Sequence, residues 1–288
     1  MPTRELIEEI KQGLINGSIV PYVGPRALNG VVDKLNGQAI PADSDSLILA
    51  LNNGQPMPPR LMYEFPRAAM HVENKRGRSF IEKFLTQTYG ERKWSNSPLH
   101  EWLASLNLPY IIDINRDTQL QQLYQDRAHT LILGASRIAG TQYRFEIYEN
   151  KNGEYKSIDQ SEVNPELPVL FKPMGSPLPK PSYVASDADY VDYITELMGG
   201  FAIPAFLKLK RQGKRYLLMG MRLTRDTERM VLSDIIYGAT DPSGWVLIPE
   251  PNDKERRFCK KLKLELVETD LSELVPGLVK PEALAETA

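Results

Sequence analysis

Residues 214–267 read KRYLLMGMRLTRDTERMVLSDIIYGATDPSGWVLIPEPNDKERRFCKKLKLELV. Short apolar runs alternate here with segments of helical periodicity, which predicts strands at 216–219, 244–248 and 264–267 and helices at 226–237 and 253–262. Apolar strands that alternate with helices are typical of a parallel sheet covered by helices on both faces. The sequence therefore predicts an α/β fold with a Rossmann-like parallel sheet, whose ligands lie beyond the carboxyl ends of the strands.

The same alternation extends toward the N-terminus. We expect a helix at 4–15, strands at 18–23, 110–114, 129–133 and 168–172, a hairpin around Asn152-Gly153, and a helix from Ser186 to Met198. Residues 43–106 have helical periodicity and interrupt the strands. We therefore predict one domain over 1–275, which includes a helical insertion at about 43–106, and a flexible C-terminal tail at 276–288.

Composition excludes several classes of protein. The 35 Lys and Arg residues nearly balance the 37 Asp and Glu residues, so nothing draws the whole chain to nucleic acid or to an anionic membrane. No apolar stretch approaches the roughly 18 residues that a transmembrane helix needs, and the first residues lack the pattern of a secretory signal. We expect a cytoplasmic protein with no membrane contact and no nucleic-acid partner.

Metal and redox chemistry have few candidate residues. Cys259 is the single cysteine, which excludes an internal disulfide and a cysteine-cluster metal site. The three histidines are His71, His100 and His129, and His100 lies among leucines in a predicted helix, where we expect it to pack. We therefore expect no metal site.

Five segments in a fixed order carry a family resemblance. They are IVPYVGPRAL at 19–28, the stretch from LHEWLA to IIDINRD at 99–117, VLFKPMGS at 169–176, SDADY at 186–190 and LLMGMRLTRD at 217–226. This ordered set resembles the motifs of sirtuin-like (SIR2-like) domains, which usually read Gly-Ala-Gly-x-Ser, Thr-Thr-Asn-x-Asp, Lys-Leu-His-Gly-Ser, Thr-x-x-Asp-Tyr and Leu-x-Gly-Tyr-Ser-Leu-x-Asp. The single cysteine fits the compact bacterial branch that has no zinc ribbon.

The resemblance implies NAD or an ADP-ribose-like nucleotide as the cofactor, with the glycines of the first loop against its diphosphate. Gly24 is kept here, but Arg26 stands at the second glycine and Leu28 at the family's serine. The Arg26 guanidinium could bind a phosphate or carboxylate, or it could fill the pocket. The alternative is that residues 24–30 form only a structural turn.

In the second motif Asn115 and Asp117 are kept, and the resemblance places that asparagine near the nicotinamide ribose. Asp113 stands at a threonine position, where its charge would repel a diphosphate unless it pairs with Arg26 or Arg116. The alternative reading is that Asn115 and Asp117 cap the start of a helix.

The third motif departs most. Met174 stands at the family's catalytic histidine, just before Gly175 and Ser176. A thioether has no titratable proton, so it cannot act as a general base, and such a base is typically worth about 10²–10⁴-fold in rate. The resemblance therefore assigns no active catalytic residue, and Asn115, Asp117 and Met174 are vestigial positions.

The late segment keeps Gly220 and Asp226, and the resemblance places it near the adenosine half of the cofactor. Arg222 and Arg225 could join Arg26 around a different anion, or they could pair with Asp226 and Glu228. The resemblance gives this candidate cofactor-binding set: Gly24, Arg26, Asn115, Asp117, Gly175, Ser176, Gly220 and Asp226.

Two further features have alternative readings. The basic run 254–263 could bind nucleic acid, but its charges surround a predicted helix and favour a solvated face. Those charges could lower the pKa of Cys259, although a partly buried, inert cysteine is preferred. Residues 61–66 are rich in Met and aromatic side chains, which are common in interfaces and in cores alike.

Arg26, Leu28 and Met174 are three departures at three chemical positions. They predict a catalytically degenerate SIR2-like protein, a non-enzymatic accessory factor that binds a partner protein. By resemblance, compact proteins of this kind accompany nitrogen-fixation genes and phage-defence systems, which suggests a bacterial assembly or regulatory partner such as a metalloenzyme complex. The alternatives are an NAD hydrolase or NAD/ADP-ribose-sensing defence protein that uses Asn115 and Asp117 with a rearranged base, and a sensor of another small anion.

Overall fold

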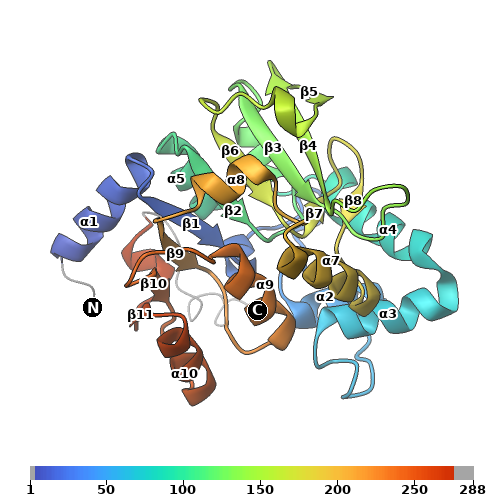
Figure 1. Cartoon of the computed structure of the whole chain (residues 1–288). Coiled ribbons are helices and arrows are strands. Elements are labelled where there is room, and N and C mark those ends of the chain that lie inside the picture. Colours follow the sequence, from blue (N-terminus) through green and yellow to red (C-terminus); the bar gives the residue numbers. More distant parts are fainter. Residues whose placement is uncertain (1–3, 276–288) are drawn as a thin grey trace.

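A central sheet with helices on both faces organises the protein (Figure 1). The structure is a computed structural model that describes residues 4–275, so the tail expected at 276–288 lies outside the described residues. The nine strands of the sheet lie in the order β11-β10-β9-β1-β2-β6-β3-β4-β5. Their bounds are β1 Ile19–Val23, β2 Tyr110–Asp113, β3 His129–Gly134, β4 Phe145–Lys151, β5 Glu154–Ser157, β6 Val169–Lys172, β9 Arg215–Met219, β10 Gly244–Leu247 and β11 Leu264–Val267.

Seven of these strands are parallel, and the predicted hairpin closes one end of the sheet. Strand β4 pairs antiparallel with β3 and with β5, and Asn152 and Gly153 form the turn between β4 and β5 with positive φ angles of 54° and 85°. An Asn-Gly pair suits such a turn because both central residues need positive φ. The prediction of a Rossmann-like α/β fold is confirmed, with this antiparallel edge added.

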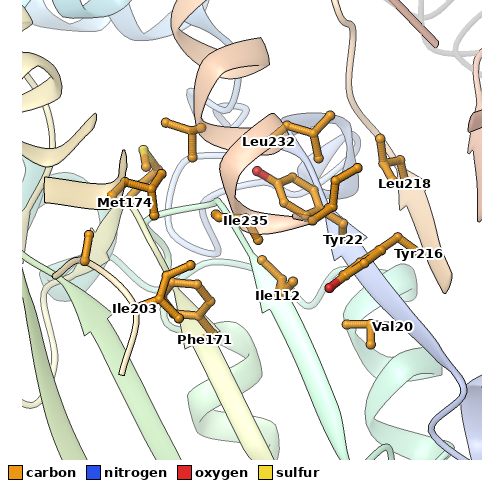
Figure 2. Close-up of a cluster of buried hydrophobic side chains, with 14 of the residues drawn as sticks. Val20, Tyr22, Ile112, Phe171, Met174, Ile203, Tyr216, Leu218, Leu232 and Ile235 are labelled. Carbon is orange, nitrogen blue, oxygen red and sulfur yellow. The ribbon is translucent and has the colours of Figure 1, made fainter. Parts of the chain in front are cut away.

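The helices divide between the two faces. Their bounds are α1 Arg4–Ile15, α2 Ser44–Leu51, α3 Phe65–Arg76, α4 Arg78–Thr86, α5 Pro98–Ser105, α6 Gln119–Leu123, α7 Asp187–Gly199, α8 Ala205–Lys210, α9 Asp226–Ile235 and α10 Asp253–Lys261. Helices α1, α5 and α6 contribute to the core on one face, and α7 to α10 to the core on the other. The strands supply both cores because successive side chains point to opposite faces: Tyr216 and Leu218 join one core, and Leu217 and Met219 join the other (Figure 2).

The insertion has a core of its own. Helices α2, α3 and α4 bury Ile48, Phe65 and Leu85 together with Leu28 from the loop after β1. Helix α3 begins at Phe65, and Pro66 sits in its first turn, where the missing N–H of proline is tolerated. Helix α8 and a small hairpin, β7 Gly175–Ser176 with β8 Ser182–Tyr183, lay outside the sequence prediction. No helix of residues 4–275 is both long and apolar enough to cross a membrane.

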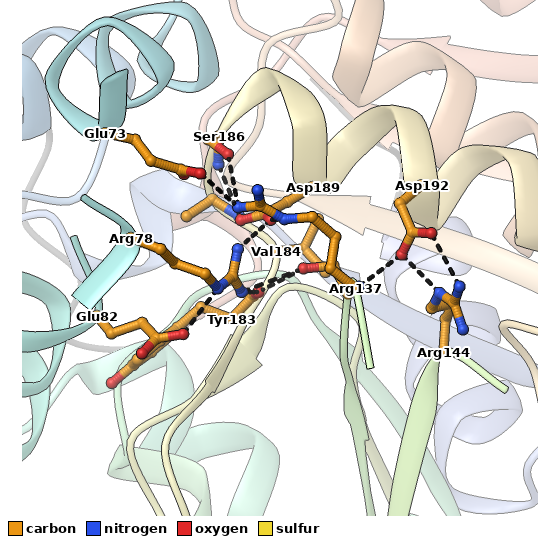
Figure 3. Close-up of polar contacts among 12 residues, drawn as sticks. Glu73, Arg78, Glu82, Arg137, Arg144, Tyr183, Val184, Ser186, Asp189 and Asp192 are labelled. Carbon is orange, nitrogen blue, oxygen red and sulfur yellow. Dashed lines mark hydrogen bonds and ion pairs between the residues drawn. The ribbon is translucent and has the colours of Figure 1, made fainter. Parts of the chain in front are cut away.

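A buried carboxylate joins the insertion to the sheet (Figure 3). Asp189, in the first turn of α7, is 1% exposed and accepts hydrogen bonds from the backbone N–H groups of Ala185 and Ser186 at 3.0 and 3.1 Å. It also accepts from Arg137, after β3, at 2.7 Å, and from Arg78 at the start of α4. Ser186 and Asp189 form a capping box at the start of α7, and two arginines from distant segments also bind Asp189.

We expect Asp189→Asn to lower the free energy of unfolding by about 2–4 kcal/mol, because it leaves two guanidiniums without their common charge. Urea denaturation measures this loss. Asp187→Asn is the matched control, because Asp187 lies in the same first turn, and its loss should stay below about 1 kcal/mol. Equal losses for both variants would contradict the role given to Asp189.

Candidate functional site

A cavity of about 60 Å³ lies at the carboxyl edge of the sheet, where β1, β2 and β6 end. Its lining combines Met174 after β6, Arg116 after β2, Tyr190 of α7, Glu64 before α3 and Glu228 of α9. A groove of about 180 Å³ adjoins it and contains Arg26, Gly220, Arg222 and Arg225. The remaining predicted cofactor residues line neither space: Gly24, Asn115, Asp117, Gly175, Ser176 and Asp226.

The loop after β1 packs against the loop after β9. The N–H groups of Gly24 and Arg26 donate to the carbonyl oxygens of Met219 and Gly220, at 2.8 and 2.6 Å. A Cβ atom at Gly24 would lie 2.4 Å from Cβ of Met221, so the chain itself fills the space that the missing side chain leaves. A phosphate cradle needs free N–H groups and open space beside glycine. This loop offers neither at Gly24 and does not fit a diphosphate.

The Asn115 side chain forms hydrogen bonds within the protein and lines neither the cavity nor the groove. Its amide donates to the Gly24 carbonyl at 3.0 Å and to Oδ1 of Asp113 at 2.8 Å. Asp113 does not take up the possible pairing with Arg26 or Arg116, because its Oδ2 forms an ion pair with Lys172 of β6. Both side chains of that pair are fully buried. The Lys172 ammonium group lies on the neighbouring strand β6 and contacts Asp113, whereas Arg26 and Arg116 form no ion pair with it.

Asp117 lies beside the same cluster. Its Oδ1 accepts from the N–H of Gln119, the first residue of α6, at 2.8 Å, whereas the N-cap of that helix is Thr118. His100 is fully buried as expected, and its Nδ1 lies 4.0 Å from Oδ1 of Asp117. His100, Asp113 and Asp117 bring donor atoms within 4.8 Å of one another, but the Lys172 ammonium already neutralises Asp113.

Met174 belongs to the hydrophobic core on one face of the sheet (Figure 2), and it also lines the cavity. It is 4% exposed, and its Sδ accepts a hydrogen bond from the Tyr190 hydroxyl at 3.0 Å. Gly175 follows with a φ of 81° in the β7–β8 hairpin, and the Ser176 hydroxyl donates to Oε1 of Gln121 at 2.7 Å. Gly175 and Ser176 therefore build a turn behind Met174.

The arginines of the groove have separate roles. Arg222 pairs with Glu255, at 2.7 Å, which corrects the expectation that it pairs with Asp226 or Glu228. Asp226 is exposed and pairs with Arg229. The Arg225 guanidinium stacks on the ring of Tyr63 at 4.9 Å, and Arg26 forms no ion pair with residues 4–275. Because Arg222 is paired with Glu255, an anion site in this groove would have only Arg26 and Arg225 as its cations.

Sequence reasoning missed the carboxyl groups of the cavity. Burial raises the pKa of Glu228 to about 7; Arg225 lowers this pKa and Glu64 raises it. Glu64 is 6% exposed and accepts from the Thr227 hydroxyl at 3.0 Å. No motif contains both carboxyl groups, because they lie 164 positions apart (228 − 64) on α9 and before α3. Only the packing of the insertion on α9 brings them together.

The basic helix near the C-terminus is solvated, as its pattern indicated. In α10 Lys254, Arg256, Arg257 and Lys260 are exposed, whereas Cys259 is buried. Burial raises the pKa of the Cys259 thiol to about 11, so the nearby lysines do not activate it.

Cys259 should consequently resist alkylation at pH 7, because the thiolate is the reactive form and its fraction grows only as pH approaches 11. Iodoacetamide labelling followed by mass spectrometry checks this. Unfolding the protein in urea should restore ordinary thiol reactivity, and rapid labelling of the folded protein would contradict the burial.

The family model of the SIR2-like domain matches residues 109–267, which is more than half of the chain. The chain belongs to the SIR2-like domain family. The matched region runs from the start of β2 to the end of β11 and contains Asn115, Met174 and Gly220, whereas the loop of Gly24 precedes it. No curated protein matches the chain.

The buried ion pair under this SIR2-like site gives a stability prediction. Lys172→Met leaves Asp113 charged and unpaired, so we expect a loss of about 3–5 kcal/mol in urea denaturation. The control Lys180→Met removes an exposed lysine 3.5 Å from Glu146 and should cost less than about 1 kcal/mol. A Lys172→Met variant as stable as the control would refute this role.

Proposed function

We propose that this SIR2-like protein has lost base-assisted NAD chemistry and acts as a non-enzymatic accessory factor that binds a partner protein. The observation that carries the proposal is Met174, which stands at the family's histidine position and lines the cavity with its thioether. A thioether cannot accept a proton from a ribose hydroxyl or from water at neutral pH. Its Sδ is already the acceptor for Tyr190.

The loops around Met174 support the same conclusion. The Asn115 amide donates hydrogen bonds to the Gly24 carbonyl and to Asp113, and Met221 fills the space beside Gly24. A dinucleotide would have to displace these protein contacts, whereas an accessory protein only needs them as a rigid frame. Relative to the family motifs, this chain keeps Gly24 and Asn115 as structural residues, whereas Arg26 and Met174 replace the residues that would bind or activate the cofactor.

Exposed apolar side chains offer a surface for a partner. Val191 and Met198 on α7 are 67% and 71% exposed, and they lie seven residues apart on one helical face. Met230 lies exposed on α9, which packs against α7. Apolar side chains gathered on a surface mark interaction sites. The resemblance suggests a bacterial assembly or regulatory partner such as a metalloenzyme complex.

The first test is nicotinamide release from NAD by wild type, by Met174→His and by the matched control Met174→Leu. We expect none of the three to release nicotinamide, because restoring the base does not reopen the loop at Gly24. Turnover by wild type that disappears in Asn115→Ala would refute the proposal.

The second test addresses the partner. Val191→Glu with Met198→Glu should weaken a complex isolated from the native host at least tenfold, because it places charge in an apolar interface. Leu35→Glu, at the exposed Leu35 outside α7 and α9, should leave the complex intact. Equal effects of both changes would contradict the α7 surface.

One observation favours a second candidate, an NAD hydrolase or NAD/ADP-ribose-sensing defence protein with a rearranged base. Glu228 lines the same cavity as Met174, and its pKa of about 7 suits a general base. If wild type does release nicotinamide, Glu228→Gln should abolish the release for this candidate. Release that survives Glu228→Gln would exclude Glu228 as the base.

A further inference from the structure

Arg116 is a buried cation that makes no ion pair within the described residues, although its charge acts on Glu228 in the same cavity. The residue is 9% exposed, and Nη2 of its guanidinium donates a hydrogen bond to the Val184 carbonyl at 2.5 Å. The guanidinium lies 5.5 Å from the centre of the Phe65 ring, and its buried Nε contacts no acceptor. No carboxylate of residues 4–275 comes within 4.0 Å of Arg116. A buried charge is costly unless a counter-charge meets it, so this cavity wall calls for an anion.

Two more polar groups of the cavity can donate hydrogen bonds. The Tyr190 hydroxyl donates to Sδ of Met174, a weak acceptor that a stronger one readily replaces. Glu228 carries a proton below its pKa of about 7 and then donates as well. Among the acceptors of the lining, Oε2 of Glu64 already receives the Thr227 hydroxyl, and the Ser44 hydroxyl oxygen receives the Phe65 N–H. A ligand that supplies two acceptor oxygens and no proton complements this set.

Much of the remaining lining is apolar, although Ser44, Arg225 and Thr227 line the cavity as well. Phe65, Ile114, Met174 and Val231 contribute hydrocarbon or thioether surface to a cavity of about 60 Å³. A phosphate or sulfate makes no apolar contacts, so it would leave these apolar walls unmatched. A ligand with a two-oxygen anionic group and a short hydrocarbon tail matches both the hydrogen-bond donors and the apolar walls of this cavity.

We propose that this cavity binds a short-chain monocarboxylate, with its carboxylate on Arg116 and Tyr190 and its tail against Phe65 and Met174. The inference rests on the proposed loss of NAD chemistry, because it gives the same cavity to another ligand. The two fail separately: nicotinamide release tests the lost chemistry, and carboxylate binding in the absence of NAD tests the ligand.

Protonation of Glu228 sets the pH dependence of binding. The charged and titratable groups that act on Glu228 from the surrounding elements are Arg225, Glu64, Arg229, Arg116, Tyr22 and Tyr190. With Glu228 neutral, Arg116 and Arg225 face Glu64 alone, and one positive charge remains for the ligand. Above pH 7 the Glu228 carboxylate competes with the ligand for these cations. Binding should therefore be present below pH 7 and weaken as pH rises through 7.

The experiment is calorimetric titration of the full chain with sodium acetate, propionate and butyrate in a buffer free of carboxylates. We expect saturable binding at pH 6 and an apparent Kd about tenfold larger at pH 8, because the protonated fraction of a group with a pKa of about 7 falls about tenfold. Glu228→Gln keeps a donor without a charge, so its Kd should be the same at both pH values.

Arg116→Met should weaken binding at least tenfold, and its circular dichroism and unfolding midpoint show whether it folds. Arg256→Met is the matched control, because Arg256 pairs with Glu268 on the surface of α10 and should leave the Kd unchanged. Absence of saturable binding by any of the three carboxylates would overturn the proposal. So would equal binding of sodium phosphate, or a Glu228→Gln variant that keeps the tenfold pH dependence.

Discussion

The ion pair of Lys172 with Asp113 fixes the middle of the carboxyl edge, and the site is built upon it. The pair joins the ends of the adjacent strands β6 and β2 at full burial. The second oxygen of Asp113 accepts from Asn115, and the Asn115 amide reaches across to the Gly24 carbonyl after β1. One chain of contacts thus sets three loops. Separating a buried ion pair strongly destabilises the fold. This series of contacts therefore leaves the three loops little freedom to open for a large ligand.

Local pattern predicted the elements well. The apolar runs at 110–114, 129–133 and 216–219 became central strands because both faces of a parallel sheet are buried. Asn152-Gly153 and the capping box at Ser186 were likewise readable from neighbouring residues. In each case the information lies within a few positions of the chain, where backbone sterics and short-range hydrogen bonds decide.

The candidate site depended on distant pairs, which no local pattern contains. Asp113 and Lys172 are 59 residues apart, and Arg222 and Glu255 are 33 apart. Leu28, expected to mark a lost ligand contact, proved to be a core residue of the insertion. The cation of Arg116 was named only as a possible partner of Asp113. Its burial beside Phe65 follows from the packing of the insertion, which the motif order does not describe.

The β4–β5 hairpin limits how copies of this protein can associate. Strand β5 closes one end of the sheet, and its outermost residues include the exposed Glu154 and Lys156. An uncovered edge strand recruits further strands through its free N–H and carbonyl groups, and charged side chains on a short edge oppose that recruitment. The sheet therefore ends where the hairpin ends. The charged side chains of this short edge strand therefore oppose continuous cross-molecule sheets, the usual start of fibrous aggregation, on this flank.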